Sequence, residues 1–117
     1  MSHVFEVESA PAGARIGLLR LRGTLDAKSA PALMERCARL RAEGQDLVLN
    51  LAEVTFIASS GIGALLALVE ECRQTGTRVR LASLSVAVAS VVRLLNLDQF
   101  LTIDETETAA LSALEGR

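Results

Sequence analysis

The chain has 117 residues, with 12 basic against 14 acidic residues and a formal charge of −2. The absence of any Lys/Arg run excludes a basic face for nucleic acid, and no apolar run is long enough to span a membrane. The start lacks a signal-peptide pattern. We therefore expect a single cytoplasmic domain over residues 1–117, with no nucleic-acid partner and no membrane insertion.

Half of the residues are apolar but only three are aromatic, all of them phenylalanine, which predicts a core of Leu, Val, Ile and Ala. Such a core suits helices packed on a sheet. Cys37 and Cys72 fall on the apolar stripes of predicted helices, so we expect buried thiols in a reducing compartment. With one histidine, His3, near the start, these cysteines do not form a metal-site pattern.

The first half of the chain predicts a hairpin followed by a helix and a central strand. Apolar patterning predicts strands over 5–7 and 16–21, joined by a turn at 11–13. A helix follows, with Ser29 as its expected N-cap and Pro31 in its first turn. The apolar segment 47–51 predicts a central strand, and residues 53–57 are expected to cross the edge of the sheet.

The second half continues the alternation of helix and strand. A helix is expected from Ile62 to about Gln74, then a strand over 78–82 and a loop formed by Ser83, Leu84 and Ser85. Ser85 is expected to cap a third helix. A last strand is expected over 100–103, and a last helix capped by Asp104 with Glu107 at the capping-box spacing. This order predicts an α/β fold with a central, mixed but mostly parallel sheet of about five strands packed with about four helices.

Two serines and two glycines stand where the central strand gives way to the second helix, at Ser59, Ser60, Gly61 and Gly63. One serine is expected to cap the helix, which leaves room for a further role. A phosphate-binding loop is disfavoured because the Walker and three-glycine spacings are absent. A serine nucleophile needs a general base, and none is apparent. We therefore expect neither an enzyme nor a cofactor.

The junction also suits a modified serine. A phosphate at a helix start would face the positive end of the helix dipole, so the fold should tolerate it. The added charge, roughly −1.5 to −2, would instead act on whatever docks there. The apolar residues Ile62 and Leu66 would then belong to the footprint of a protein partner.

Three segments in register carry a resemblance to a known family. Residues 47–51 followed by 54–63 resemble the core motif of STAS domains, specifically bacterial anti-sigma factor antagonists. The segment 23–26 is similar to the Gly-x-Leu-Asp turn of that family, and residues 81–97 match it in spacing. The resemblance covers about residues 4 to 115 and implies a STAS fold for the chain.

The resemblance implies a partner-switching mechanism. The unphosphorylated antagonist binds an anti-sigma factor that is also a serine kinase, which frees a sigma factor. Phosphorylation releases the antagonist, and a metal-dependent serine phosphatase resets it. Carried over by position, the phosphorylated residue is Ser59. The aspartate that often precedes this serine in the family is Ala58 here.

A second hypothesis is a constitutive STAS subunit of a transport complex, which docks a transporter ATPase without phosphorylation. In either case the partner surface is expected where strands feed helices, at one edge of the sheet. The residues predicted to contact a partner are Leu25, Asp26, Ser59, Ser60, Gly61, Ile62, Leu66, Ser83, Leu84 and Ser85.

Overall fold

The computed structural model describes residues 5–13 and 15–115 and contains every expected strand and helix in the expected order. The elements are β1 (Glu6–Ala10), β2 (Ile16–Leu25), α1 (Ala30–Ala42), β3 (Asp46–Ile57), α2 (Ser59–Thr75), β4 (Val79–Ala82), α3 (Val86–Leu94), the 3-10 helix η1 (Leu97–Gln99), β5 (Ile103–Asp104) and α4 (Glu107–Glu115). The strands form one sheet in the order β1-β2-β3-β4-β5. Strand β1 is antiparallel to β2, and the other described strands pair in parallel. The predicted mixed, mostly parallel α/β fold is confirmed.

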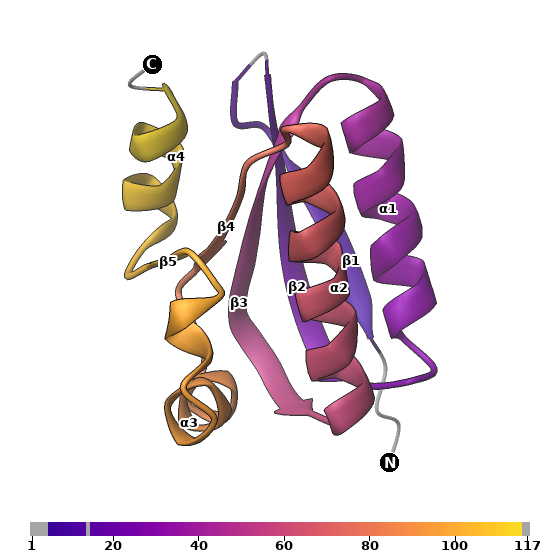
Figure 1. Ribbon diagram of the computed structural model, residues 1–117, viewed down its shortest axis with the longest axis vertical. Coiled ribbons are helices and arrows are strands. Elements are labelled where there is room, and N and C mark those ends of the chain that lie inside the picture. Colours follow the sequence, from indigo (N-terminus) through magenta and orange to yellow (C-terminus); the bar gives the residue numbers. More distant parts are fainter. Residues whose placement is uncertain (1–4, 14, 116–117) are drawn as a thin grey trace.

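The helices cover the two faces of the sheet unequally (Figure 1). The larger apolar cluster joins one face to α1, α2 and α3, and β3 contributes Leu47, Leu49 and Leu51 to it. A smaller cluster joins the other face to α4. Within the described residues, no helix is both long and apolar enough to cross a membrane.

The two thiols are buried on α1 and α2, as the apolar stripes of these helices predicted. Cys37 and Cys72 are free and fully buried. Burial raises the pKa of Cys37 to about 12 and also raises the pKa of Cys72. Both thiols are therefore protonated and suited to packing rather than to chemistry. The part of the chain that the structure describes contains no group of three potential metal ligands.

Strands β2 and β3 are longer than the sequence indicated. The expectation that residues 53–57 cross the sheet edge is wrong, because they extend β3 to Ile57 and pair with the extended end of β2. Two register shifts between the strands keep Val54 and Ile57 directed into the core. The loops that follow β2 and β3 therefore lie well beyond the end of the shorter β4.

The C-terminal part departs most from prediction. The last strand covers only 103–104, because the chain before it forms η1 and leaves Phe100 exposed. The predicted cap at Asp104 is also wrong, since this residue belongs to β5. Instead, the hydroxyl of Thr106 accepts a hydrogen bond from the N–H of Ala109 at 3.0 Å.

Candidate functional site

A single residue, Ala58, separates the end of β3 from the start of α2. Ala58 is the N-cap of α2 and has an extended conformation. Ser59 and Ser60 are therefore its first two helical residues, and both are exposed. The carbonyl of Ala58 accepts the N–H of Ile62 at 3.0 Å, and no side chain caps the helix within the described residues. The expectation that one serine caps α2 is wrong, because helical geometry has already begun at Ser59.

The end of β2 holds the start of α2 in place. The carbonyl oxygen of Leu25 accepts the N–H of Ala58 at 2.9 Å. A methyl group at Gly61 would overlap that same oxygen and lie 3.0 Å from the carbonyl carbon. Only glycine therefore permits this close approach of helix and strand.

This packing corrects two predicted partner contacts. The side chain of Leu25 is 0% exposed, and Gly61 is buried against it. Neither residue can offer side-chain surface to a partner. Both act instead by positioning the adjacent serines.

A hydrogen-bonded turn connects β2 to α1. The Asp26 carboxylate accepts the N–H groups of Lys28 at 3.0 Å and Ser29 at 3.1 Å. The Ser29 hydroxyl donates to the carbonyl of Thr24 at 2.8 Å and accepts the N–H of Asp26 at 2.9 Å. Ser29 therefore stabilises the loop and does not cap α1 with its side chain, contrary to expectation.

The same bonds set the charge of the turn. The backbone N–H of Ser29 contributes most to holding the pKa of Asp26 below its ordinary value. A carboxylate that accepts several N–H groups is stabilised in its charged form. Asp26 thus presents a fixed negative charge beside the start of α2.

A hollow lies between this turn and α2, lined by Asp26, Lys28, Phe56 and Ser60 among others. Sequence reasoning missed Lys28 and Phe56. Phe56 is 57% exposed because the alternation of β3 directs it away from the core that receives Ile57. Phe56 thereby contributes exposed apolar surface to the lining of the hollow.

The third predicted segment, the Ser83–Ser85 loop, is set back along β3. Strand β4 ends opposite Asn50, and the N–H of Ser85 donates to the carbonyl of Leu51 at 3.2 Å. The end of β2, by contrast, pairs with Ile57. The structure therefore brings the β2–α1 turn and the serine junction together and leaves this loop beside the middle of β3. The predicted Ser85 cap is confirmed, since its hydroxyl accepts the N–H of Val88 at 3.2 Å.

The apolar side of α2 is shared between the core and α3. Leu68 is 1% exposed, whereas Ile62 and Leu66 are only partly buried. Ile62 and Leu66 line a narrow apolar gap together with Val91 of α3. Part of the predicted footprint therefore already packs against α3.

Comparison with known proteins identifies this architecture. Residues 9–110 match the sequence model of the STAS domain. The chain belongs to the STAS domain family. Its fold is similar to that of an anti-sigma factor antagonist from Mycobacterium paratuberculosis, with 22% identity and a TM-score of 0.84 over 98% of this chain and 97% of that chain.

Two further solved structures share the STAS fold. The anti-sigma factor antagonist SpoIIAA in its unphosphorylated form is 22% identical, with a TM-score of 0.75 over 97% of this chain and 98% of that chain. The Bacillus cell fate determinant SpoIIAA in the phosphorylated form is 21% identical, with a TM-score of 0.68 over 95% of this chain and 99% of that chain. The family resemblance seen in the sequence is thereby confirmed.

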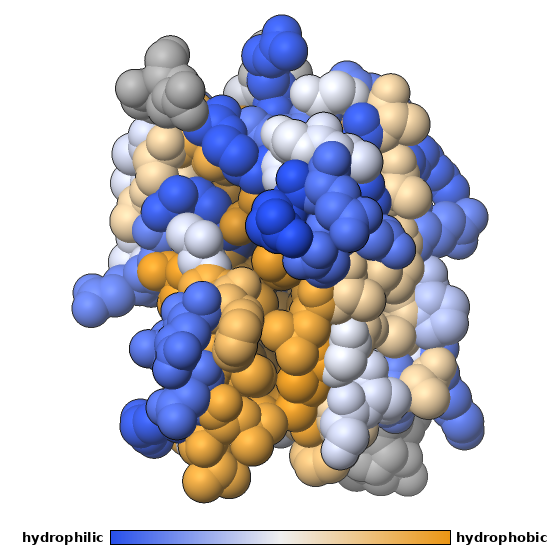
Figure 2. Space-filling model, in the orientation of Figure 1, coloured by the Kyte–Doolittle hydropathy of each residue, from blue (hydrophilic) through white to orange (hydrophobic). Residues whose placement is uncertain are grey.

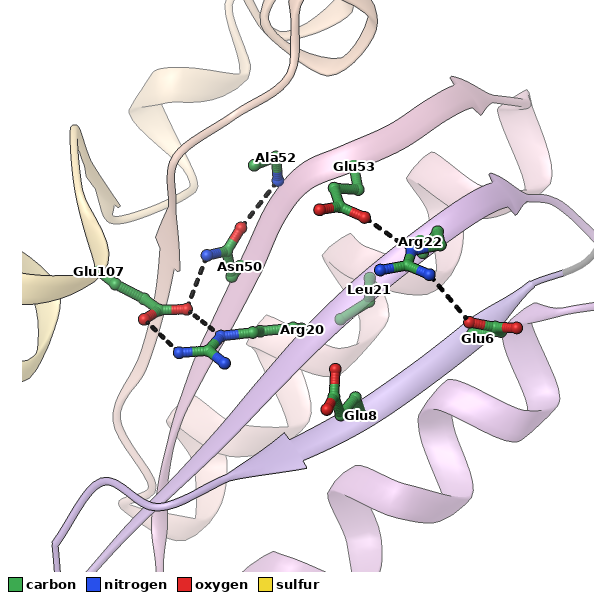
Figure 3. Close-up of a pocket in the computed structure, with 9 residues that line it drawn as sticks. All are labelled: Glu6, Glu8, Arg20, Leu21, Arg22, Asn50, Ala52, Glu53 and Glu107. Atoms are coloured by element: carbon green, nitrogen blue, oxygen red, sulfur yellow. Dashed lines mark hydrogen bonds and ion pairs between the residues drawn. The ribbon is translucent and has the colours of Figure 1, made fainter.

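The face of the STAS sheet that α4 covers carries a second polar group of residues (Figure 3). The Glu107 carboxylate accepts Arg20 Nε and Asn50 Nδ2, each at 2.7 Å. Arg22 Nε pairs with Glu53 at 2.6 Å. Sequence reasoning missed these pairs and assigned Glu107 to a capping box.

The hydrogen bond from Arg20 is the main cause that lowers the pKa of Glu107. Since Glu107 begins α4 while its partners lie on β2 and β3, the bonds attach the last helix to the sheet. This polar group therefore has a structural role, on the face of the sheet opposite to α2.

Proposed function

We propose that this STAS domain is an anti-sigma factor antagonist controlled by phosphorylation of Ser59. The unphosphorylated form binds an anti-sigma factor with serine kinase activity and so frees a sigma factor. Phosphorylation of Ser59 releases the domain, and a metal-dependent serine phosphatase restores it. The observation that carries the proposal is the exposed serine at the first helical position of an uncapped α2.

The start of α2 is suited to a phosphate. The first N–H groups of a helix have no partner within it, and the helix dipole favours negative charge there. The first turn of α2 contains no acidic residue that would compete. A phosphate on Ser59 is therefore compatible with the folded domain, and its charge is available to act on a partner.

The proposed partner surface comprises the β2–α1 turn with Asp26, the exposed Ser59 and Ser60, and the partly exposed Ile62 and Leu66 of α2. The Ser83–Ser85 loop lies at its margin. A doubly charged phosphate enclosed by a docked protein would lose its hydration at a large cost. Phosphorylation therefore opposes docking without unfolding the domain. In this role the protein is a binding partner and the substrate of a kinase, and it needs neither catalytic residues nor a cofactor of its own.

The test uses a purified anti-sigma factor kinase from the same organism and three variants. Ser59→Ala should bind the kinase like the wild type and take up no phosphate. Ser59→Asp should bind at least about tenfold more weakly, because it places charge at the junction. Ser60→Ala is the matched control, since it removes a neighbouring exposed hydroxyl and should still be phosphorylated.

Isothermal titration and phosphosite mapping provide the measurements. The proposal fails if Ser59→Asp binds the kinase as tightly as the wild type, or if phosphate is found on Ser60 instead. Unmodified Ser59 in cells under all growth conditions would favour the constitutive transport subunit.

A further inference from the structure

Helix α3 and the turn after it expose four large apolar side chains, which we call the α3 patch. The exposed fractions are 84% for Val86, 79% for Leu94, 51% for Leu95 and 65% for Phe100. Figure 2 shows apolar surface gathered at the lower left, where Figure 1 places α3, with hydrophilic residues along its outer side. The patch presents roughly 500 Å² of apolar surface, which is near the upper end for a monomeric protein.

Packing inside the domain does not explain the α3 patch. A helix that packs on one core is usually apolar on one side only, and α3 already buries Val88 and Val92 in the core. Val86, Ser90 and Leu94 follow one another at intervals of four residues, and all three are exposed. They therefore form a row along the side of α3 that faces away from the core.

This row is symmetric about its centre. Ser90 stands in the middle of the nine residues of α3, with one large apolar residue a turn before it and another a turn after it. When two copies of α3 lie antiparallel and cross at Ser90, Val86 of each copy meets Leu94 of the other. The small serine allows the two helices to approach closely at the crossing. Mutual pairing of this kind is what a two-fold interface requires, so the row is complementary to itself.

We infer that the protein forms a two-fold dimer through the α3 patch, with the two α3 helices crossing at Ser90. The area of the patch suits this partner. Homodimer interfaces are about 65% apolar, so roughly 500 Å² of apolar surface corresponds to about 770 Å² in total on each copy. A specific, stable interface buries about 800 Å² on each partner. The inference goes beyond the proposed function and depends neither on phosphorylation nor on the kinase.

The charges of α3 also favour a lasting contact between two copies. Arg93 is the only charged residue of α3, and it lies beside the row, in the lining of a hollow that includes Asp98. Since Arg93 is three residues from Ser90, the two arginines of the dimer lie about 9 Å apart along the helix axis and do not face each other. Transient interfaces are about as polar as the rest of a protein surface, whereas homodimer interfaces are more apolar. A row without charge therefore fits a permanent partner better than a transient one.

Sedimentation equilibrium of the full chain tests the inference. The wild type should be a dimer with a Kd that is micromolar or tighter, as expected for an interface of this size. Leu94→Gln should raise the Kd at least about tenfold, since it places an amide where a large apolar contact is made. Leu94 is largely exposed, so the variant should keep the circular dichroism spectrum of the wild type. Ala109→Gln is the control, because Ala109 is exposed on α4, at the other face of the sheet, and this variant should dimerise normally.

A disulfide across the two-fold axis tests where the copies meet. Ser90→Cys places a thiol at the crossing point, while the native thiols of Cys37 and Cys72 are fully buried. With helix axes about 10 Å apart, facing Cα atoms lie about 5 Å apart, which a disulfide can span. Oxidised glutathione should therefore convert most of the Ser90→Cys protein to a covalent dimer. Ser112→Cys is the matched control, since Ser112 is an exposed serine of α4, and it should stay mostly monomeric on a non-reducing gel.

Three results would overturn the inference. The first is a wild type that sediments as a monomer up to about 100 µM, far above the expected Kd. The second is a dimer that Leu94→Gln leaves as tight as the wild type, because the copies would then meet elsewhere. The third is equal cross-linking of the two cysteine variants, which indicates random collision. None of these measurements involves Ser59 or the kinase, so such a failure would leave the proposed function standing.

Discussion

The close contact between Gly61 and Leu25 makes a sharp test of how the serine junction is built. Gly61→Ala places a methyl group against the carbonyl oxygen of Leu25, a backbone atom that cannot rotate away. Either the start of α2 or the end of β2 must move. Gly63→Ala is the matched control, because it makes the same change two residues later, where the added methyl group would have no atom within 4 Å apart from its chain neighbours and the backbone of its own helix.

The expected effects have opposite signs. Alanine is better than glycine inside a helix by about 1 kcal/mol, so Gly63→Ala should stabilise the domain by up to that amount. Overpacking costs about 1–3 kcal/mol, and separating the Ala58 N–H from Leu25 costs about another 1 kcal/mol. After the gain in helix propensity, Gly61→Ala should destabilise the domain by about 1–3 kcal/mol.

Urea unfolding followed by circular dichroism measures both variants, and the two should differ by about 2–4 kcal/mol in their free energies of unfolding. Gly61→Ala should also lower the rate of Ser59 phosphorylation, since it displaces the first turn of α2. Equal stability of the two variants would show that the start of α2 is not held by this contact.

Three further substitutions test other contacts. Ser85→Ala removes the hydroxyl that caps α3 and should cost about 1 kcal/mol in urea unfolding, whereas Ser60→Ala, at the uncapped α2, should change stability by less than about 0.5 kcal/mol. Glu107→Gln weakens the bonds from Arg20 and Asn50 and should cost about 1 kcal/mol at neutral pH. Because the folded-state pKa of Glu107 is lowered, its contribution is present above the usual glutamate value of about 4.3 and is lost as pH falls through the folded-state value. The deficit of the variant should therefore shrink in acid, and a constant deficit down to about pH 3 would contradict this.

Short-range sequence signals located the elements of this fold well. The apolar run 47–51 forms a central strand, because helices cover its side chains on both faces of the sheet. Ser85 lies directly before an apolar helix with no competing partner, so its role as a cap followed from local geometry alone. The strand-helix alternation then placed the Asp26 turn beside Ser59.

Long-range contacts determined what sequence reasoning got wrong. The extension of β3 to Ile57 depends on pairing with β2. The hydroxyl of Ser29 donates its hydrogen bond to the carbonyl of Thr24, across the loop, and so is not available to cap α1. Glu107 has the spacing of a capping box, but Arg20 on a distant strand offers it a charged partner. A local sequence pattern indicates which hydrogen bonds a side chain is able to make. Which of them forms depends on the partners that the tertiary structure brings near.

Ala58 now has a physical interpretation. As an N-cap without a polar side chain, it leaves the first N–H groups of α2 without a side-chain acceptor, and a phosphate on Ser59 can occupy them. Ala58→Asp would supply a competing carboxylate. In the unphosphorylated protein this variant should gain about 1 kcal/mol of stability from the new cap.

Phosphorylation should cancel that gain, because the new carboxylate and the phosphate compete for the same N–H groups and repel each other by about 1 kcal/mol across a few ångströms of water-exposed surface. Urea unfolding of wild type and Ala58→Asp, each with and without phosphate on Ser59, forms a double-mutant cycle. We expect an unfavourable coupling of about 1–2 kcal/mol. If Ala58→Asp instead gains the same stability in both phosphorylation states, the phosphate does not rest on the helix start. Ala58 would then have no part in accommodating it, and the tolerance of the fold for a charge at Ser59 would have to come from solvent exposure alone.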